Sequence, residues 1–383
     1  MVNLPWRVLV RDAARTIVGP LTAWTSLDVV LRASSGGTWT MKCPAGGHAD
    51  LLGPGAGLLV VPPWEVSAPL FSGPVTELST ASGAGAPVLE VTGIDDTGLL
   101  NDRLVLPNPA LGLAAQDDAA YWTHTAAGEN VIRRVVHLNA GEGALAGRGF
   151  VTVSDETVAD PAGATVTINS RFQPLGDAVA EMAAAARLAV RVIQAADSAN
   201  LNLEIREPAD LRDALTFSEL RGNLESYSYR LAAPKASRVV VGGQGEGAAR
   251  HFVERSSTTA EAEWSRRVEV FRDARDTDDT TTLQQRGDET LAADAATAGL
   301  AIVPVDTPGA RFGIDYQLGD IVSVVAHTSQ WAEYISEVRI TVDADGTTIR
   351  PSVGSAELAD TSVRLYRRVR DIATRTSQIE RRL

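Results

Sequence analysis

The chain has a single cysteine, Cys43, in 383 residues. One thiol excludes an internal disulfide and cannot supply the several thiolates of a structural zinc site. The five histidines show no pair at zinc-ligand spacing. We therefore expect Cys43 to be a buried apolar side chain, and we expect no metal or other cofactor.

Long apolar runs and basic character are missing as well. No stretch approaches the roughly 20 apolar residues that span a bilayer, and Met1–Arg15 lacks the pattern of a signal peptide, so we expect no membrane anchor. The formal net charge of −13 disfavours broad attachment to nucleic acid, because such binding depends on cations that neutralise phosphates. A surface that faces DNA without binding it is compatible with this charge. Lys42 and Lys235 are the only lysines, a bias that hints at GC-rich coding and an actinobacterial setting.

The overall composition is that of a folded protein, with 44% hydrophobic and 22% charged residues. A chain of this length exceeds the size at which a single core keeps growing, so we expect several packed units. The first hundred residues predict short strands separated by glycine and proline, the pattern of an antiparallel sandwich or barrel. These strands are expected at Arg7–Val10, Leu27–Arg32, Thr38–Met41, Leu58–Val61, Val75–Leu78 and Val88–Thr92. A connector follows at Asn108–Ala120.

The middle of the chain predicts a mixture of helices and strands. Apolar residues recur with helical spacing over Leu175–Ala196, and Leu201, Leu203 and Ile205 then alternate with polar residues as in a half-buried strand. This order predicts an α+β insertion. A second helix is expected at Thr281–Gly299. Further strands are expected at Val131–Leu138, Phe150–Val153, Thr165–Ile168, Tyr227–Arg230, Ser237–Val241, Leu300–Val305, Ile321–Val325, Tyr334–Val342 and Thr347–Val353.

The C-terminal segment has the a/d spacing of a coiled coil. Its apolar positions step by four and three residues through Leu365, Val369, Ile372, Thr376, Ile379 and Leu383. The pattern is compatible with self-association, with docking on a partner, and with a helix packed on the protein's own body, because so few heptads do not fix a stable zipper.

The sequence motifs that could indicate ligand binding or catalysis are weak. The loop Gly242–Gly247 lacks the Lys-Ser or Lys-Thr of a phosphate-binding loop, and the acidic run Asp273–Asp279 lacks the glycine and the downstream glutamate of a calcium loop. No serine lies in a Gly-x-Ser-x-Gly elbow. The carboxylate pairs Asp95-Asp96 and Asp117-Asp118 are compatible with a glycosidase but are more typical of turns and surfaces. We predict no catalytic residues and no enzyme activity.

Several segments, taken together and in this order, resemble the tail hub family of actinobacterial siphophages over about residues 1–355. They are Gly37–Thr40, Phe71–Val75, Gly93–Asp96 before Leu104–Pro107, Arg221–Leu224, Val240–Gly245 and the turn and strand Leu318–Val324. The resemblance implies a mainly β fold with an α+β insertion, made of two tail-tube-like β-barrels, a mixed domain and a C-terminal helix.

The resemblance also implies an organisation and a role. Residues 1–106 would form the first barrel, residues 200–245 and 312–354 the second, residues 107–199 and 246–311 the insertion, and residues 355–383 the helix. Such a protein would form a homotrimeric ring at the virion's tail tip, assembled in the host cytoplasm. The ring would join the distal tail or tail tube protein to tip or fibre proteins, with the tape measure protein as a possible neighbour. DNA would pass through it during genome ejection without specific binding.

Two other functions stay open. The first is a receptor-binding module whose tryptophan and tyrosine side chains stack on cell-wall sugars, although core and subunit contacts are the commoner use of such residues. The second is a peptidoglycan hydrolase that uses two carboxylates.

Overall fold

The computed structural model describes residues 5–46, 51–82, 87–153, 158–305, 307–326 and 329–354. The chain divides into two compact units: unit 1 is Met1–Ser226 with Ile302–Ser352, and unit 2 is Tyr227–Ala301 with Val353–Leu383. Strands dominate, with a few helices, so the predicted mainly β fold with an α+β insertion is confirmed. None of the described helices is long and apolar enough to cross a membrane.

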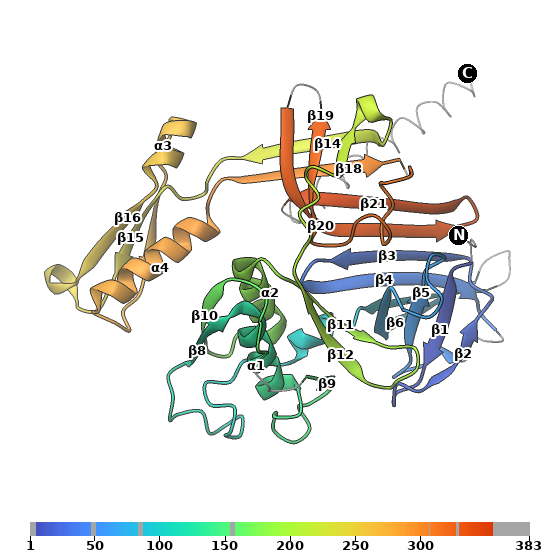
Figure 1. The fold of residues 1–383 in the computed structure, drawn as a ribbon. Helices are drawn as coiled ribbons and strands as arrows, with labels where there is room; N and C mark the ends of the chain where they lie inside the picture. The colour runs from blue at the N-terminus through green and yellow to red at the C-terminus, as the bar shows by residue number, and fades with distance from the viewer. Residues whose placement is uncertain are drawn as a thin grey trace. The chain divides into compact units, whose positions relative to one another are not determined.

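Unit 1 begins with an antiparallel sheet, called here the N-terminal sheet (blue in Figure 1). Its strands are β1 (Arg7–Arg11), β2 (Ile17–Leu21), β3 (Ser26–Arg32), β4 (Ser35–Pro44), β5 (Gly57–Val61), β6 (Phe71–Ala81) and β7 (Val88–Ile94). They are ordered β3-β4-β7-β6-β5-β1-β2. All strands predicted for this region are present. β2 was not predicted because Gly19-Pro20 interrupts its apolar run, and a proline is tolerated there because β2 lies at the sheet edge.

The N-terminal sheet buries alternate residues of its strands. On β4, Trp39, Met41 and Cys43 are each at most 1% exposed, so the expected burial of Cys43 is confirmed. The Trp39 indole Nε1 donates a hydrogen bond of 3.0 Å to the carbonyl of Ile94. Its ring lies over Gly93, where an added Cβ would be 2.3 Å from two ring carbons. The packing of this tryptophan therefore requires glycine on the neighbouring strand.

An α/β region follows in unit 1 (green in Figure 1). It contains β8 (Trp122–Ala127), α1 (Gly128–Ala140), β9 (Val151–Thr152), β10 (Thr165–Ser170), α2 (Leu175–Ala186), β11 (Ala189–Gln194) and β12 (Leu201–Arg206). β8 pairs with β10, and β11-β12-β9 form a separate sheet. Both helices bury apolar faces in one core, to which Ile132, Val179 and Val192 contribute.

Two predictions in this region were wrong. The segment Val131–Leu138 was expected to be a strand but lies in α1. Its buried residues, Val131, Ile132, Val135 and Val136, follow the helical period, which outweighs the strand preference of valine. The helix expected over Leu175–Ala196 ends at Ala186, where Arg187 takes a left-handed conformation with φ of 58°. β11 then alternates buried Val190 and Val192 with exposed Arg191.

The C-terminal part of unit 1 extends the N-terminal sheet. β20 (Ser329–Asp343) pairs with β3, which places Val338 opposite Leu31 and Ile340 opposite Val29. Beyond β20 the order continues with β21 (Gly346–Gly354). The strands β14 (Leu224–Ala232) and β18 (Thr297–Pro304) pair with each other, and each includes residues of both units. β13 (Thr216–Ser218) pairs with β19 (Ile321–Ala326), which pairs with β20.

Unit 2 contains a three-stranded sheet with a helix on one face (yellow and orange in Figure 1). β15 (Arg238–Gly242) lies between β16 (Phe252–Ser256) and β17 (Glu269–Asp273), with α3 (Thr258–Trp264) after β16. α4 (Thr280–Ala293) packs Leu283 against Val239 and Val241. The helix expected over Thr281–Gly299 ends at Ala293, and β18 starts at Thr297. Short 3-10 turns occur at Gly98–Asp102, Glu219–Arg221 and Gly247–Ala249.

The coiled-coil positions Leu365, Val369, Ile372, Ile379 and Leu383 lie outside the described residues, and so does the whole segment 355–383.

Candidate functional site: a polar seam and a pocket in unit 1

Strand β11 is held to the N-terminal sheet by side-chain hydroxyl groups. One edge of β11 pairs with β12, and the alternate N–H groups of its other edge are bound by hydroxyls from the β3–β4 turn, β6 and the segment after β7. The pairs are Val190 N to Ser34 Oγ (3.1 Å), Val192 N to Thr97 Oγ1 (3.1 Å) and Gln194 N to Ser72 Oγ (2.8 Å). We call these contacts the seam. These hydroxyls accept hydrogen bonds from the backbone N–H groups of β11 in place of a neighbouring strand.

A buried ion pair completes the seam. The Arg11 guanidinium donates to both carboxylate oxygens of Asp96, at 2.6 and 2.7 Å, and the two side chains are 4% and 0% exposed. Arg11 also donates to Gln194 Oε1 at 2.8 Å, and Ser72 Oγ donates to Asp96 at 2.5 Å. A two-pronged guanidinium–carboxylate contact is among the strong hydrogen-bond geometries. This network therefore fixes the α/β region against the N-terminal sheet.

Asp95 has a different environment from its neighbour. Its Oδ1 accepts a hydrogen bond of 2.9 Å from the backbone N–H of Gly98, and its side chain lines a pocket. Burial raises the pKa of Asp95 to about 6, against the opposite effect of the Gly37 and Gly98 amides.

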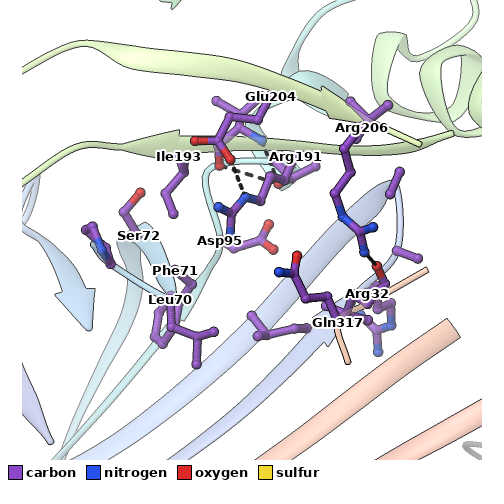
Figure 2. Close-up of a pocket in the computed structure, with 18 of the residues that line it drawn as sticks. Arg32, Leu70, Phe71, Ser72, Asp95, Arg191, Ile193, Glu204, Arg206 and Gln317 are labelled. Atoms are coloured by element: carbon purple, nitrogen blue, oxygen red, sulfur yellow. Dashed lines mark hydrogen bonds and ion pairs between the residues drawn. The ribbon is translucent and has the colours of Figure 1, made fainter. Parts of the chain in front are cut away.

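The pocket has a volume of about 500 Å³ and lies next to the seam, between β11, β12, the β5–β6 loop and the segment before β19. Four arginines line it, and each has an acidic partner. The pairs are Arg32–Glu337 (3.0 Å), Arg133–Glu129 (2.8 Å), Arg191–Glu204 (2.6 Å) and Arg206–Asp320 (2.8 Å). Figure 2 shows Arg191 and Glu204 linked to each other beside Asp95. Because these cations are already neutralised, the pocket is not a ready-made anion site.

Two of the four carboxylates that the sequence suggested as candidates, Asp96 and Asp118, are bound by other side chains. The pocket lining contains neither histidine nor cysteine. Asp96 is fully occupied by Arg11 and Ser72, and in the other pair Asp118 accepts a hydrogen bond of 2.7 Å from Asn108. Within the described ranges, no group of three or more His, Cys, Asp or Glu residues is arranged to hold a metal ion.

The weaker sequence candidates in unit 2 have structural roles. Gly242–Gly247 lies at the end of β15 and in the loop before β16. Asp276 pairs with Arg286 through two contacts of 2.6 Å, and these hydrogen bonds lower the pKa of Asp276 to about 2. The Asp279 side chain caps α4 by accepting a hydrogen bond of 2.7 Å from Thr282 N. This acidic run therefore forms an ion pair and a helix cap.

The seam itself was not predicted from the sequence. Ser34 and Thr97 belong to no segment singled out in the sequence, and Ser72 was noted only within Phe71–Val75, which resembles the tail hub family. Their partners on β11 are 95 to 156 residues away. Adjacent Asp95 and Asp96 were noted as a possible carboxylate pair and as part of the Gly93–Asp96 segment of the family resemblance, but not as members of a buried network. The one available signal was that two acidic residues directly follow a buried strand.

Comparison with known proteins identifies the family. The model of the siphovirus ReqiPepy6 Gp37-like protein family matches residues 6–355. The chain belongs to this family. The resemblance to a siphophage tail protein family is thereby confirmed, and the protein is a phage tail protein. Among curated proteins, none matches the chain.

Solved structures of tail proteins share the fold of this siphophage tail protein. A tail protein from Neisseria meningitidis MC58 aligns with a TM-score of 0.53 at 15% identity, over 92% of this chain and 97% of that one. The 43 kDa tail protein of prophage MuSo2 from Shewanella oneidensis aligns with a TM-score of 0.55 at 12% identity, over 91% and 98%. Prophage tail protein gp18 from Listeria monocytogenes EGD-e gives 0.50 at 10% identity, over 94% and 97%. The likeness covers nearly the whole of each chain.

Proposed function

We propose that this tail protein is a non-enzymatic hub subunit that forms a ring at the tail tip. The observation that carries the proposal is the match to a siphophage tail protein family over residues 6–355. In this proposal the ring joins the tail tube or distal tail protein to tip or fibre proteins, and DNA passes through it during ejection. The acidic net charge of −13 favours passage without retention, because like charges repel the polyanion.

The proposed organisation keeps the predicted parts. Residues 1–106 form a first tube-like barrel, residues 200–245 and 312–354 a second, and residues 107–199 and 246–311 an α+β insertion. Two tube-like barrels in each of three subunits would present six similar surfaces to a six-fold tube. The pairing of β20 with β3 supports a continuous contact between the N-terminal and C-terminal strands that such a joint needs.

The C-terminal segment is proposed as the element that selects three copies. In the heptad register, Leu365, Ile372 and Ile379 occupy d positions, and isoleucine at d favours trimers or tetramers over dimers. In a parallel arrangement, Arg375 at a g position would face Glu380 at an e position of the next chain. This contact would form between subunits of a trimer, and the oligomer test distinguishes such an assembly from a helix packed on its own subunit.

The oligomer test uses the full chain in solution. Light scattering should give the mass of a trimer, and the double variant Ile372→Asn with Ile379→Asn should shift the mass towards the monomer. Thr374→Asn, at an outward f position, is the matched control and should leave the mass unchanged. A monomeric parent protein, or an unchanged mass for the double variant, would refute the assignment of this segment.

The position test uses assembled particles. Electron microscopy of tails should place the chain at the tip with three-fold symmetry. Density elsewhere in the tail, or a copy number that matches the tube, would refute the hub role.

The two alternative functions depend on aromatic side chains in one case and on paired carboxylates in the other. All seven tryptophans fall within the described residues, and each is buried or half-buried, whereas Tyr121, Tyr229 and Tyr334 are exposed. For the hydrolase, the occupied carboxylate of Asp96 removes one of the candidate pairs. A zymogram with peptidoglycan should show no clearing, and clearing by the purified chain would overturn the non-enzymatic assignment.

A further inference from the structure

Strands β8 and β10 form a two-stranded sheet with one face open to solvent. The register pairs Thr125 with Thr167 and Thr123 with Asn169. On the inner face, Val166 and Ile168 are buried in the core of the α/β region. The outer-face residues are all exposed: Tyr121, Thr123, Thr125, Thr165, Thr167 and Asn169. We call this set the hydroxyl strip.

Hydrogen bonds within the strip order its side chains. Thr123 Oγ1 donates to Asn169 Oδ1 at 3.1 Å, and the hydroxyls of Thr125 and Thr167 lie 2.8 Å apart. Whichever of these two hydroxyls donates, the proton of the other remains available to a ligand. Asn169 accepts through Oδ1, so its amide NH2 is also a donor for a ligand. The strip is therefore a pre-ordered row of neutral donors and acceptors.

The strip lacks charge. Residues 119–127 and 161–170 contain no Asp, Glu, Lys or Arg, although 22% of the chain is charged. Solvent-exposed strands of two-stranded sheets commonly carry charged residues that discourage unwanted pairing. A polyanion or polycation would find no charge partner on these strands. The surface instead suits a neutral polar ligand.

Aromatic side chains lie at one end of the strip. Tyr121 is 44% exposed and Phe172 is 40% exposed, and the Arg171 guanidinium lies 5.6 Å from the centre of the Phe172 ring. An exposed tyrosine has an apolar face for C–H groups and a hydroxyl for hydrogen bonds. The threonine methyl groups add small apolar contacts between the hydroxyls.

We propose that the hydroxyl strip binds a neutral polysaccharide. Sugar rings present C–H faces beside uncharged hydroxyls, and the strip offers aromatic and methyl surface beside uncharged donors and acceptors. The match rests on this chemistry and does not depend on the hub role. Binding by the isolated protein therefore tests it separately from assembly.

The test measures binding of soluble galactan, arabinan and mannan to the purified full chain by calorimetry, with polygalacturonate as a charged comparison. At least one neutral polymer should bind, with an affinity that is insensitive to salt because no ion pair contributes. The variant Thr125→Val with Thr167→Val keeps the side-chain shape and strand preference but removes two hydroxyls. It should weaken binding about tenfold.

The matched control is Thr76→Val with Thr80→Val, two exposed threonines of β6 in the N-terminal sheet, and it should bind like the parent. Tyr121→Ala should weaken binding, whereas Tyr121→Phe should retain most of it. The inference is overturned if no neutral polymer binds, if only polygalacturonate binds, or if the strip variant binds as well as its control. A strip variant that changes the mass of the oligomer would instead identify a subunit interface and would also overturn it.

Discussion

Arg11 and Asp96 lie 85 residues apart in the sequence and meet in a buried ion pair whose nitrogen–oxygen distances are 2.6 and 2.7 Å. Because Gln194 of β11 accepts a third hydrogen bond from the same guanidinium, the pair connects two regions of unit 1. Its main role is to hold the seam in one arrangement.

Removal of one member of this pair should be strongly destabilising. Arg11→Ala leaves the Asp96 carboxylate buried without its partner, and we expect a loss of about 3–5 kcal/mol in the free energy of unfolding. Urea denaturation provides the measurement. Arg191→Ala breaks the half-exposed pair with Glu204 and should lose at most about 1 kcal/mol. Equal losses in the two variants would contradict the structural importance of the Arg11–Asp96 pair.

The seam hydroxyls should control the opening of β11. Ser72→Ala removes the acceptor of the Gln194 N–H and a donor to Asp96, so we expect a loss of about 1–3 kcal/mol. Hydrogen exchange should become faster at Gln194 and its neighbours on β11. Thr76→Val, on the exposed part of β6, is the control and should leave the exchange of β11 unchanged. Uniform acceleration throughout unit 1 would point to global destabilisation instead.

Asp95 should make stability depend on pH. Its folded pKa of about 6 lies above the ordinary value near 3.9, so the fold disfavours the charged form. This penalty is absent below pH of about 4, grows as the pH rises, and is complete above about 6. Asp95→Asn should therefore gain up to about 3 kcal/mol relative to the parent at neutral pH and lose that advantage in acid. Denaturant unfolding over this pH range provides the measurement, and a pH-independent difference would contradict the shift.

Gly93 should not accept a side chain. A Cβ there would lie 2.3 Å from the Trp39 ring and 2.2 Å from the Pro74 carbonyl oxygen. Gly93→Ala should lower the unfolding free energy by about 1–3 kcal/mol, because the tryptophan must move out of its packed position. The emission of Trp39 should change as well. Gly53→Ala has no atom within 4 Å of the new Cβ and should be nearly neutral, which separates local crowding from a general effect of glycine.

The strands of the N-terminal sheet could be predicted because their apolar residues alternate between clear turn residues. The valine-rich part of α1 was misread, since its strand preference conflicts locally with a helical burial pattern that becomes decisive only in the core shared with α2. The end of α2 was missed for a related reason. Ala189–Gln194 continues an apolar run, and only the left-handed Arg187 separates helix from strand.

The candidate site was less predictable than the fold. Its contacts join isolated hydroxyls to backbone amides far along the chain, and single serines and threonines leave no periodic signal. The hydroxyl strip was equally hidden, because Thr165 and Thr167 were visible only as part of an expected strand. Its partner strand β8 was not predicted, so the two rows were never placed side by side.

The anchoring of β11 has a consequence for assembly. An unpaired strand edge can form hydrogen bonds with another extended chain, and such aggregation becomes more frequent as the concentration of the protein rises before a particle forms. Ser34, Ser72 and Thr97 already occupy the amides along this margin from inside the same molecule. The edge of β11 that these hydroxyls occupy is therefore closed to a strand from a second chain.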